Sequence, residues 1–277
     1  MFDAVKVKND CVQWIRDYFK DNPDGKAILG ISGGKDSTIA AALCVEALGA
    51  DRVIGVMMPD GVQVDIADSA EVCSILGIKS LYVDIGRAYW GLSMELATAI
   101  YGDRRDIQPV SEVVSNKMYA TNTPARIRMA TLYAVAAFYP HSRVVNTCNR
   151  SEDYVGYSTK FGDAAGDFSP FGNLTVRELL EIGDALGVPE NVINISILPE
   201  RLVHKIPSDG MCGKSDEDNL GFTYEELDDY LLNGTECKTS LETIAKIEKM
   251  HGATRHKYQP MPIFSHYKKP FIDELLD

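Results

Sequence analysis

Several features that mark secreted and membrane proteins are missing from this chain of 277 residues. The most apolar stretch, residues 129–139, is too short to cross a bilayer as a helix. The first twenty residues mix charged with apolar side chains, which excludes the apolar core of a signal peptide. None of the six cysteines forms a C-x-x-C pair, so the sequence predicts neither a zinc site nor a disulfide scaffold. We therefore expect reduced thiols and a cytoplasmic protein without a membrane partner.

Basic residues are also scarce, because 28 Lys and Arg face 40 Asp and Glu, a formal net charge of -12. This acidity repels a phosphate backbone, so nucleic acid is a disfavoured partner. No internal repeat or low-complexity tract is present. Hydrophobic residues at 45% and charged residues at 25% are typical of a folded globular protein. The length fits one large domain or two compact ones.

Short β-rich runs alternate with stretches whose apolar residues recur three and four positions apart. That alternation is typical of βαβ units, in which each helix packs an apolar stripe on a parallel sheet. The sequence therefore predicts an α/β fold with a doubly wound, mostly parallel sheet and helices on both of its faces. The predicted strands are residues 27–31, 53–58, 81–85 and 144–147.

Helix start and stop signals are legible along the chain. Apolar residues at helical spacing from Val12 to Phe19 predict an amphipathic first helix. A threonine followed three residues later by glutamate is typical of a capping box, and a glycine where the apolar pattern stops is typical of a helix end. Three helices are predicted in this way, with starts at Thr175, Thr223 and Thr239 and ends at Gly187, Gly234 and Gly252. Thr123–Pro124 predicts the start of a further helix.

The most informative segment follows the first predicted strand and reads Gly30-Ile31-Ser32-Gly33-Gly34-Lys35-Asp36-Ser37. Its glycines allow the main chain to approach an anion, and the free N–H groups at the start of the next helix point outward. The two serine hydroxyls add donors. Mg²⁺ is commonly bound by one or two carboxylates together with phosphate oxygens, which makes Asp36 a candidate ligand. The segment therefore predicts a pyrophosphate-binding loop.

For the two glycines alone, a plain strand-to-helix turn is the alternative interpretation. The segment is not a Walker A loop, because Leu29 stands where that motif needs glycine and Asp36 where it needs serine or threonine. G-x-G-x-x-G is absent from this turn. The pattern S-G-G-x-D-S resembles the phosphate loop of the ATP pyrophosphatases, which transfer AMP to a substrate and release pyrophosphate.

Further segments resemble one group of that class, the ammonia-dependent NAD synthetases. They occur in order from about residue 26 to the end of the chain, which is more specific than the loop alone. The segments are N-T-P-A-R-I-R-M at 122–129, N-T-C-N-R-S-E at 146–152, G-Y-S-T-K-F-G-D and its continuation at 156–170, P-S-D-G-M and G-K-S-D-E within 207–217, Leu220–Gly221, and His256–Lys257 with Pro260.

The resemblance implies a single NAD synthetase domain over residues 1–277, of the adenine nucleotide alpha hydrolase type, without a glutamine amidotransferase or nitrilase module. It implies two steps in one site. ATP adenylates the nicotinate carboxylate of deamido-NAD and releases pyrophosphate, and ammonia then displaces AMP to give NAD, the last step of NAD biosynthesis. An anion-binding helix start with Mg²⁺ suits the first step, because it neutralises the leaving pyrophosphate. The family works as a homodimer, which we expect here.

The resemblance also implies the site residues, position by position. ATP is expected to contact Gly30, Ile31, Ser32, Gly33, Gly34, Lys35, Asp36, Ser37, Thr147 and Ser208. Deamido-NAD is expected to contact Arg126, Lys160, Asp167, His256 and Lys257. The expected ligands of Mg²⁺ are Asp36 and Glu152, and the expected catalytic residues are Asp36, Lys160 and Asp163. Asp163 would attract ammonium or accept its proton. Cationic groups suit a substrate that carries a pyrophosphate and a carboxylate.

Two positions depart from the family pattern. Related sequences usually carry lysine in an L-x-K stretch that touches ATP, whereas this chain reads Leu174-Thr175-Val176. We expect weaker phosphate binding unless Lys35, in the variable place of the loop, supplies the missing cation. An unchanged ATP affinity in the variant Lys35→Ala would exclude that role. At the second position, Tyr258 replaces an arginine of the family.

Three other functions stay open from the sequence. A GMP synthetase-type core would share the phosphate loop but lack the segments at 156–167 and 207–221, and activity on XMP would favour it. A tRNA-modifying adenylating enzyme would be expected to show a basic face and often cysteine pairs, which the charge and the cysteine spacing oppose. A non-catalytic nucleotide sensor would not need Glu152, Lys160 and Asp167 together. For an NAD synthetase of this length we expect turnover with ammonium and little with glutamine alone.

Overall fold

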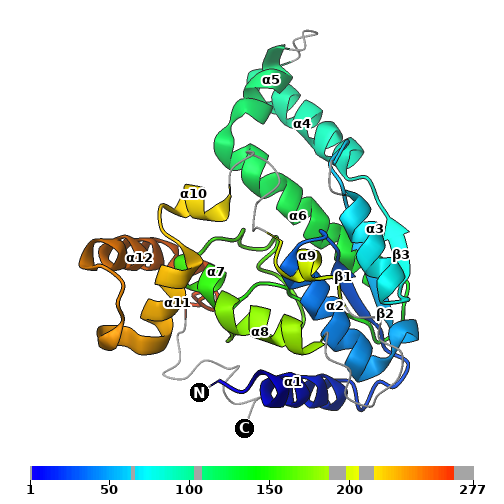
Figure 1. The fold of residues 1–277 in the computed structure, drawn as a ribbon. Helices are drawn as coiled ribbons and strands as arrows, with labels where there is room; N and C mark the ends of the chain where they lie inside the picture. The colour runs from blue at the N-terminus through cyan, green and yellow to red at the C-terminus, as the bar shows by residue number, and fades with distance from the viewer. Residues whose placement is uncertain (1, 64–65, 103–107, 187–197, 206–214, 265–277) are drawn as a thin grey trace.

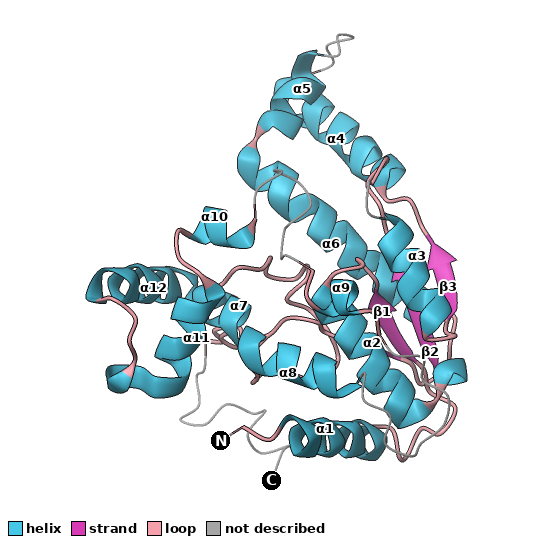
Figure 2. Ribbon diagram, in the orientation of Figure 1, coloured by secondary structure: helices cyan, strands magenta, loops and turns pink. Residues whose placement is uncertain are grey.

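Parallel strands form the sheet in the computed structural model, which describes residues 2–63, 66–102, 108–186, 198–205 and 215–264. Within these residues four strands pair in the order β3–β2–β1–β4 (Figure 2). They are β1 (Ala27–Gly30), β2 (Val53–Met57), β3 (Lys79–Tyr82) and β4 (Arg143–Val144). The predicted parallel sheet is confirmed. The strand expected at 81–85 begins and ends earlier, and the one expected at 144–147 is shorter because the chain leaves the sheet toward a functional loop.

Chain order and sheet order reverse beside β1. From β1 the chain runs through α2 (Lys35–Leu48) to β2 and through α3 (Ile66–Ile75) to β3. It then returns by α4 (Gly86–Tyr101), α5 (Gln108–Ser115) and α6 (Lys117–Ala136) to β4, on the opposite side of β1. In open α/β sheets, ligands bind at the carboxyl ends of the strands where such a reversal occurs. The loops after β1 and β4 are therefore the place to look for a site.

Helices cover both faces of the sheet, as predicted. Side chains alternate along each strand, so Leu29 packs with α1 (Ala4–Tyr18), α2 and α8 (Val176–Leu186), while Ile28 and Ile54 face α6 (Figure 1). Position 55 in β2 is a glycine, and a Cβ there would lie too close to its neighbours, 2.8 Å from Ile31 Cγ1 and 2.9 Å from Cys73 Sγ. This close approach lets α3 pack directly on the centre of the sheet.

A smaller apolar cluster lies beside the sheet. It is built around Val155, Val176, Tyr224, Leu227 and Ile247. These residues come from α7 (Arg150–Val155), α8, α11 (Tyr224–Asn233) and α12 (Leu241–Thr254), which group on one side of the molecule in Figure 1 together with α10 (Asp216–Leu220). The cluster fixes α7, which begins shortly after β4, against the C-terminal helices. The remaining short elements are α9 (Glu200–Val203), η1 (Ala50–Arg52), η2 (Gly234–Glu236) and η3 (Arg255–Lys257).

The expected helix starts at Thr175 and Thr223 are confirmed. Both threonines exchange capping hydrogen bonds with the glutamate three residues on, and the helix from Thr223 ends at Gly234 as predicted. The start at Thr239 is wrong by one residue, because Ser240 caps Thr243 N while Thr239 Oγ1 donates to Glu226 O. Gly252 lies inside α12 rather than at its end, and Gly187 lies outside the described residues.

The helix start expected at Thr123–Pro124 is also wrong. α6 already begins at Lys117, where the side chain of Asn116 accepts from Tyr119 N, and Pro124 lies within the helix. A proline removes one internal hydrogen bond but does not always end a helix that packing holds in place. Among the described helices, none combines the length and the apolar character needed to span a membrane.

Candidate active site

The phosphate loop connects β1 to α2 at the reversal point of the sheet. Gly33 has φ +75°, a conformation that glycine adopts at no steric cost, and Gly34 is the N-cap of α2. Ser32 and Ser37 are joined through their hydroxyls at 3.1 Å, and Ser32 Oγ accepts from Gly34 N at 3.2 Å. Gly34 places no side chain over the first turn of α2. That helix start therefore presents main-chain N–H groups and a positive dipole end to an anion.

Lys35 and Asp36 form a buried ion pair at the first turn of α2. The Lys35 side chain is only 3% exposed, and its Nζ lies 2.7 Å from Asp36 Oδ2. Burial alone would lower the pKa of Lys35, but the carboxylates of Asp36, Glu152 and Asp216 together raise it. The ammonium therefore stays charged and serves as counterion to the carboxylates around it.

Asn149 joins the two predicted ligands of Mg²⁺. Its Nδ2 donates to Asp36 Oδ1 at 3.1 Å, across 113 residues of sequence. As the N-cap of α7 it also accepts from Glu152 N, while its own N–H donates to Glu152 Oε2. Burial and the charge of Asp36 raise the pKa of Glu152 well above its ordinary value, although Lys35 opposes this shift. The structure thus brings Asp36 and Glu152 to one place.

The residues present fit a Mg²⁺ ion that arrives with phosphate. Two carboxylates, those of Asp36 and Glu152, are held on the same asparagine at the uncapped helix start. Mg²⁺ is commonly bound by one or two carboxylates, with phosphate oxygens and water completing its shell. Within the described part of the chain, no set of three or more acidic, His or Cys side chains is arranged to hold a metal by protein ligands alone. The donor set therefore suits a metal shared with a nucleotide.

The predicted basic residues gather at the loop that follows α7. Arg126 on α6 donates from Nε to Lys160 O, and Lys160 Nζ donates to His256 O at 2.6 Å. Lys257 Nζ donates to Gly156 O and Ser158 O, both at 2.7 Å. Residues from three distant parts of the sequence thus form one cationic group. Arg126 and His256 are exposed, so their side chains can meet a ligand.

Asp163 belongs to the same loop. Its Oδ1 accepts from Thr159 N at 2.9 Å, and the Thr159 hydroxyl donates to Asn122 on α6, which ties the loop to that helix. Desolvation raises the pKa of Asp163, although the Thr159 hydrogen bond opposes the shift. A carboxyl group with a raised pKa is a better proton acceptor near neutral pH than an ordinary aspartate.

Three other predicted residues have different surroundings. Thr147 lies in the loop after β4, shortly before the Asn149 cap. The carboxylate of Asp167 accepts from Val144 N at 2.7 Å and from the Tyr133 hydroxyl at 3.1 Å, so it braces β4 rather than joining the cationic group. Ser208 lies outside the described residues.

Sequence reasoning missed three residues around the ion pair. Asn149 and Asp216 stand within the motif segments but carried no expected role. Tyr224 had no signal in the sequence beyond its place after the Thr223 cap. Its ring lies 5.7 Å from Lys35 Nζ, and its buried hydroxyl has no hydrogen-bond partner among the described residues. Tyr224 thus forms an aromatic wall of the site beside the ammonium.

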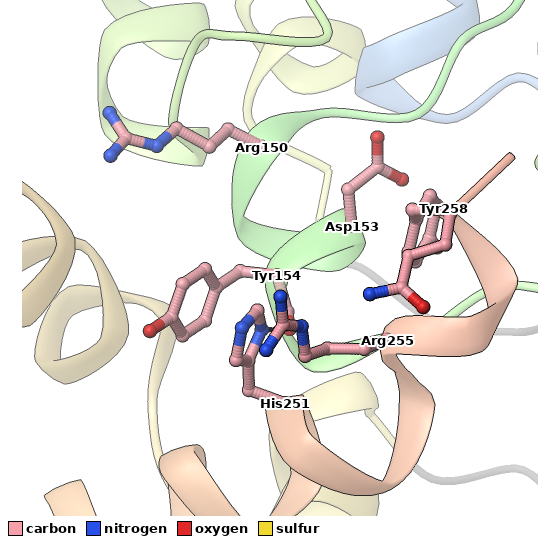
Figure 3. A pocket seen from close by; sticks show the side chains of 7 residues that line it. Arg150, Asp153, Tyr154, His251, Arg255 and Tyr258 are labelled. Carbon is pink, nitrogen blue, oxygen red and sulfur yellow. Dashed lines mark hydrogen bonds between the residues drawn. The ribbon is translucent and has the colours of Figure 1, made fainter. Parts of the chain in front are cut away.

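A cavity of about 290 Å³ lies between α7 and the C-terminal helix (Figure 3). Side chains from α7 face those from α12 and the turn after it. His251 stacks on Tyr154 with ring centroids 4.1 Å apart. The cavity is lined by residues that include Arg150, Asp153, Tyr154, His251, Arg255 and Tyr258. Tyr258, which replaces the family's arginine, bonds Ser158 in the loop that carries Lys160. The cavity therefore adjoins the cationic group.

The family model described as NAD synthase matches residues 7–269 of this chain. The chain belongs to the NAD synthase family. A relative from Finegoldia magna, an NH(3)-dependent NAD(+) synthetase, is 36% identical over 237 residues, which cover 85% of this chain and 87% of the relative. An NMN synthetase structure from Francisella tularensis matches at a TM-score of 0.76 and 30% identity, over 96% of this chain and 100% of that one. An NAD+ synthetase structure from Burkholderia pseudomallei has a TM-score of 0.69 and 27% identity, over 93% and 91% of the two chains.

Membership of the NAD synthase family confirms the predicted fold and the predicted reaction class. The protein is a ligase that forms a C–N bond with ATP as a substrate, and its reaction is the amidation of deamido-NAD to NAD with ammonia. The three other functions that the sequence left open are set aside, since they would belong to other families. The phosphate loop is thus the ATP pyrophosphatase loop that its letters suggested.

Proposed function

We propose that both steps of the amidation take place between the phosphate loop and the loop at 156–163. The observation that supports this best is the uncapped start of α2 beside the Asp36–Asn149–Glu152 cluster, at the reversal point of the sheet. The main-chain N–H groups at Gly33 to Ser37 would hold the ATP phosphates, with the nearby Thr147 and, as predicted, Ser208. The group formed by Arg126, Lys160, His256 and Lys257 would hold the charged groups of deamido-NAD. Asp167, which braces β4 outside this group, would contact the same substrate from there.

In the first step an oxygen of the nicotinate carboxylate attacks the α-phosphorus of ATP, and pyrophosphate leaves. The start of α2 would stabilise the negative charge that develops on the leaving group. Asp36 and Glu152 would hold Mg²⁺, which when bound supplies further charge neutralisation to the phosphates. Lys160 would keep the carboxylate in position for this attack, because it reaches from the loop toward the C-terminal residues.

In the second step the nitrogen of ammonia attacks the acyl carbon, and AMP leaves with the electron pair of the broken C–O bond. The attacking nitrogen must lose a proton. Asp163 would accept it, which its raised pKa favours. The same carboxylate would attract the ammonium ion to the site, where the ion must first give one proton to solvent so that its nitrogen can attack as ammonia.

A product assay tests this function. Purified protein with ATP, Mg²⁺, deamido-NAD and ammonium is expected to form AMP, pyrophosphate and NAD in equal amounts, measured by chromatography. Glutamine in place of ammonium is expected to support little turnover. Formation of ADP would contradict a role of the loop in pyrophosphate release, and robust turnover with glutamine would contradict direct use of ammonia.

The mononucleotide is the second candidate substrate, because the structural neighbour with a TM-score of 0.76 is an NMN synthetase. The corresponding reaction would amidate nicotinate mononucleotide. The same assay with both nicotinates decides between them through the ratio of kcat/KM, and a ratio in favour of the mononucleotide would overturn deamido-NAD as the main substrate.

A homodimer would form through α4 and the neighbouring start of α6, which project from the sheet (Figure 1). α4 exposes Trp90 at 51% and Ile100 at 63%, and Met118 at the start of α6 is 71% exposed. Large exposed apolar residues on neighbouring helices can form part of a protein interface. The substitution Trp90→Glu is expected to weaken the dimer by about 30-fold or more, as loss of a central aromatic anchor does.

Sedimentation velocity over a range of concentrations measures this effect. Phe138→Glu is the matched control, because Phe138 is 84% exposed but lies at the other end of α6. A wild-type protein that is monomeric at micromolar concentration would refute the proposed dimer.

The thiols agree with a reducing compartment. All five described cysteines are free, and burial raises the pKa of Cys11 to about 12 and of Cys73 to about 11, which makes them unreactive. A cytoplasmic location therefore stays our proposal, and fractionation of cells that express the tagged protein tests it.

A further inference from the structure

Lys35 is an unusual residue for the place it occupies. Lysine side chains are rarely buried unless they are paired, yet this one is 3% exposed at the first turn of α2. Its ammonium lies 2.7 Å from Asp36 Oδ2 and 5.7 Å from the centre of the Tyr224 ring. The side chain therefore turns away from solvent and toward the carboxylates of the site.

The surroundings of the ammonium are those of a cation site. Asn149 binds both carboxylates, because its side-chain Nδ2 donates to Asp36 Oδ1 and its main-chain N–H donates to Glu152 Oε2. Asp216, at the start of α10, is buried and adds negative charge within range of Lys35. Asp36 pairs directly with the ammonium, while Glu152 and Asp216 add negative charge nearby, so the cluster keeps an excess of negative charge when all three are ionised.

Position 176 on α8 supplies no cation to the site. Val176, which stands where related sequences usually carry lysine, is 5% exposed and packs in the apolar cluster that contains Tyr224. A lysine at that position would have approached the site from α8. In this chain the described cation beside the Asp36–Glu152 pair is the one contributed by the phosphate loop itself.

We propose that Lys35 is an exchangeable counterion. Its ammonium occupies the metal position between Asp36 and Glu152 until ATP brings Mg²⁺, and it then pairs with the phosphates. This inference rests on the proposed function, because it takes Asp36 and Glu152 as the ligands of the metal. Two cations cannot be held by the same carboxylates without strong repulsion in a partly desolvated site. The incoming metal therefore displaces the ammonium, which then pairs with the ATP phosphates bound at the same loop.

The exchange gives the nucleotide-free enzyme a low affinity for divalent metal. Replacement of Lys35 by a neutral side chain removes the competing cation and leaves the carboxylates without a partner. The variant Lys35→Met, similar in length but without a charge or a hydrogen-bond donor, is therefore expected to bind Mn²⁺ at least about tenfold more tightly than the wild type in the absence of nucleotide. Paramagnetic resonance of free Mn²⁺ measures this affinity without any turnover.

Two further variants make the test specific. Lys35→Gln keeps a polar side chain in case the methionine variant does not fold, and it is expected to gain Mn²⁺ affinity as well. The double variants with Glu152→Gln are expected to lose the gained affinity, which locates the new binding at this pair. Wild-type protein is expected to bind Mn²⁺ tightly only when a non-hydrolysable ATP analogue is present.

The remaining outcomes distinguish a failure of this inference from a failure of the proposed function on which it rests. Equal Mn²⁺ affinities of wild type and both Lys35 variants without nucleotide, with tight binding in the presence of the analogue, would overturn the exchange but leave the metal role of Asp36 and Glu152 intact. A gain in the glutamine variant without a gain in a folded methionine variant would also overturn it, since the amide oxygen would then be the new ligand. Absence of Mn²⁺ binding even with the analogue would contradict the proposed metal site and the exchange together.

Discussion

Replacement of Gly33 by alanine is expected to lower kcat/KM for ATP by about 100-fold, the loss that a displacement of about 1 Å in a positioned site produces. Gly33 has φ +75°, where a residue with a Cβ is strained. A Cβ at this position would also lie 2.7 Å from Asp68 Cβ and 2.9 Å from Ser69 N. These atoms belong to α3, which packs on the sheet, so the loop must move and the N–H groups at the start of α2 move with it.

Two glycines serve as controls for this variant, measured by steady-state kinetics and urea unfolding. Gly34→Ala adds a Cβ at φ -85°, where only Ser32 Oγ lies near, at 3.2 Å, and we expect a smaller loss than for Gly33→Ala. Gly77→Ala imposes a positive φ of +63° in open space, and it is expected to cost about 1 kcal/mol of stability with unchanged kinetics. Activity of Gly33→Ala within threefold of the wild type would show that the loop geometry is not required.

The phosphate loop could be predicted from sequence because all of its determinants are local. Strand β1, the two glycines and the first turn of α2 lie within a dozen residues, and the sheet places their junction at the reversal point. The alternation of β-rich runs with stretches of helical spacing likewise predicted the parallel sheet and its two covered faces. In both cases the pattern in the chain and the physical cause act over the same short distance.

The partners within the site could not be predicted in the same way. The contact of Asn149 with Asp36 depends on how β4 lies beside β1, and Lys35 meets Tyr224 and Asp216 only because the C-terminal helices pack against α7 and α8. A motif names residue types but not the directions of side chains. The motif predicts a contact of Lys35 with the phosphates, but it does not show that the ammonium pairs with Asp36 in the structure.

Competing local signals explain the errors in helix boundaries. Thr239 and Ser240 are both good N-caps, and Asp229 Oδ2 accepts from the N–H of Thr239, which leaves Ser240 to cap α12. Asn116 caps α6 eight residues before Pro124, which therefore lies inside the helix. The capping residue of each helix depends on side chains distant in sequence or on a neighbour that is equally suited as an N-cap. Spacing alone therefore could not identify the true cap.

The substitution Glu152→Gln is expected to separate activity from stability. Without one of the two carboxylates proposed to hold Mg²⁺, kcat is expected to fall by about 100-fold to 1,000-fold, the range for loss of a charge-stabilising group at a reacting centre. Stability is expected to stay equal or rise at pH 7.5. The pKa of Glu152 is raised in the fold, so its ionised form is less stable there than in the unfolded chain, and the neutral amide removes that penalty.

The raised pKa of Glu152 also determines how the stability gain of Glu152→Gln depends on pH. Below the ordinary pKa of 4.5 the carboxyl group is protonated in both folded and unfolded chains, and the stability difference between Glu152→Gln and wild type should vanish there. It should reach its full size above the raised pKa of the folded state.

Glu226→Gln is the matched control, since Glu226 occupies the same capping-box position at the start of α11. It lies far from the phosphate loop in sequence and is bonded to Thr223. Its pKa is lowered by the Thr223 N–H, so its amide variant is expected to lose stability at neutral pH and to keep full kcat. Equal losses of kcat in the two variants, or a marked loss of stability in Glu152→Gln at pH 7.5, would assign Glu152 to capping alone and remove it from the proposed metal site.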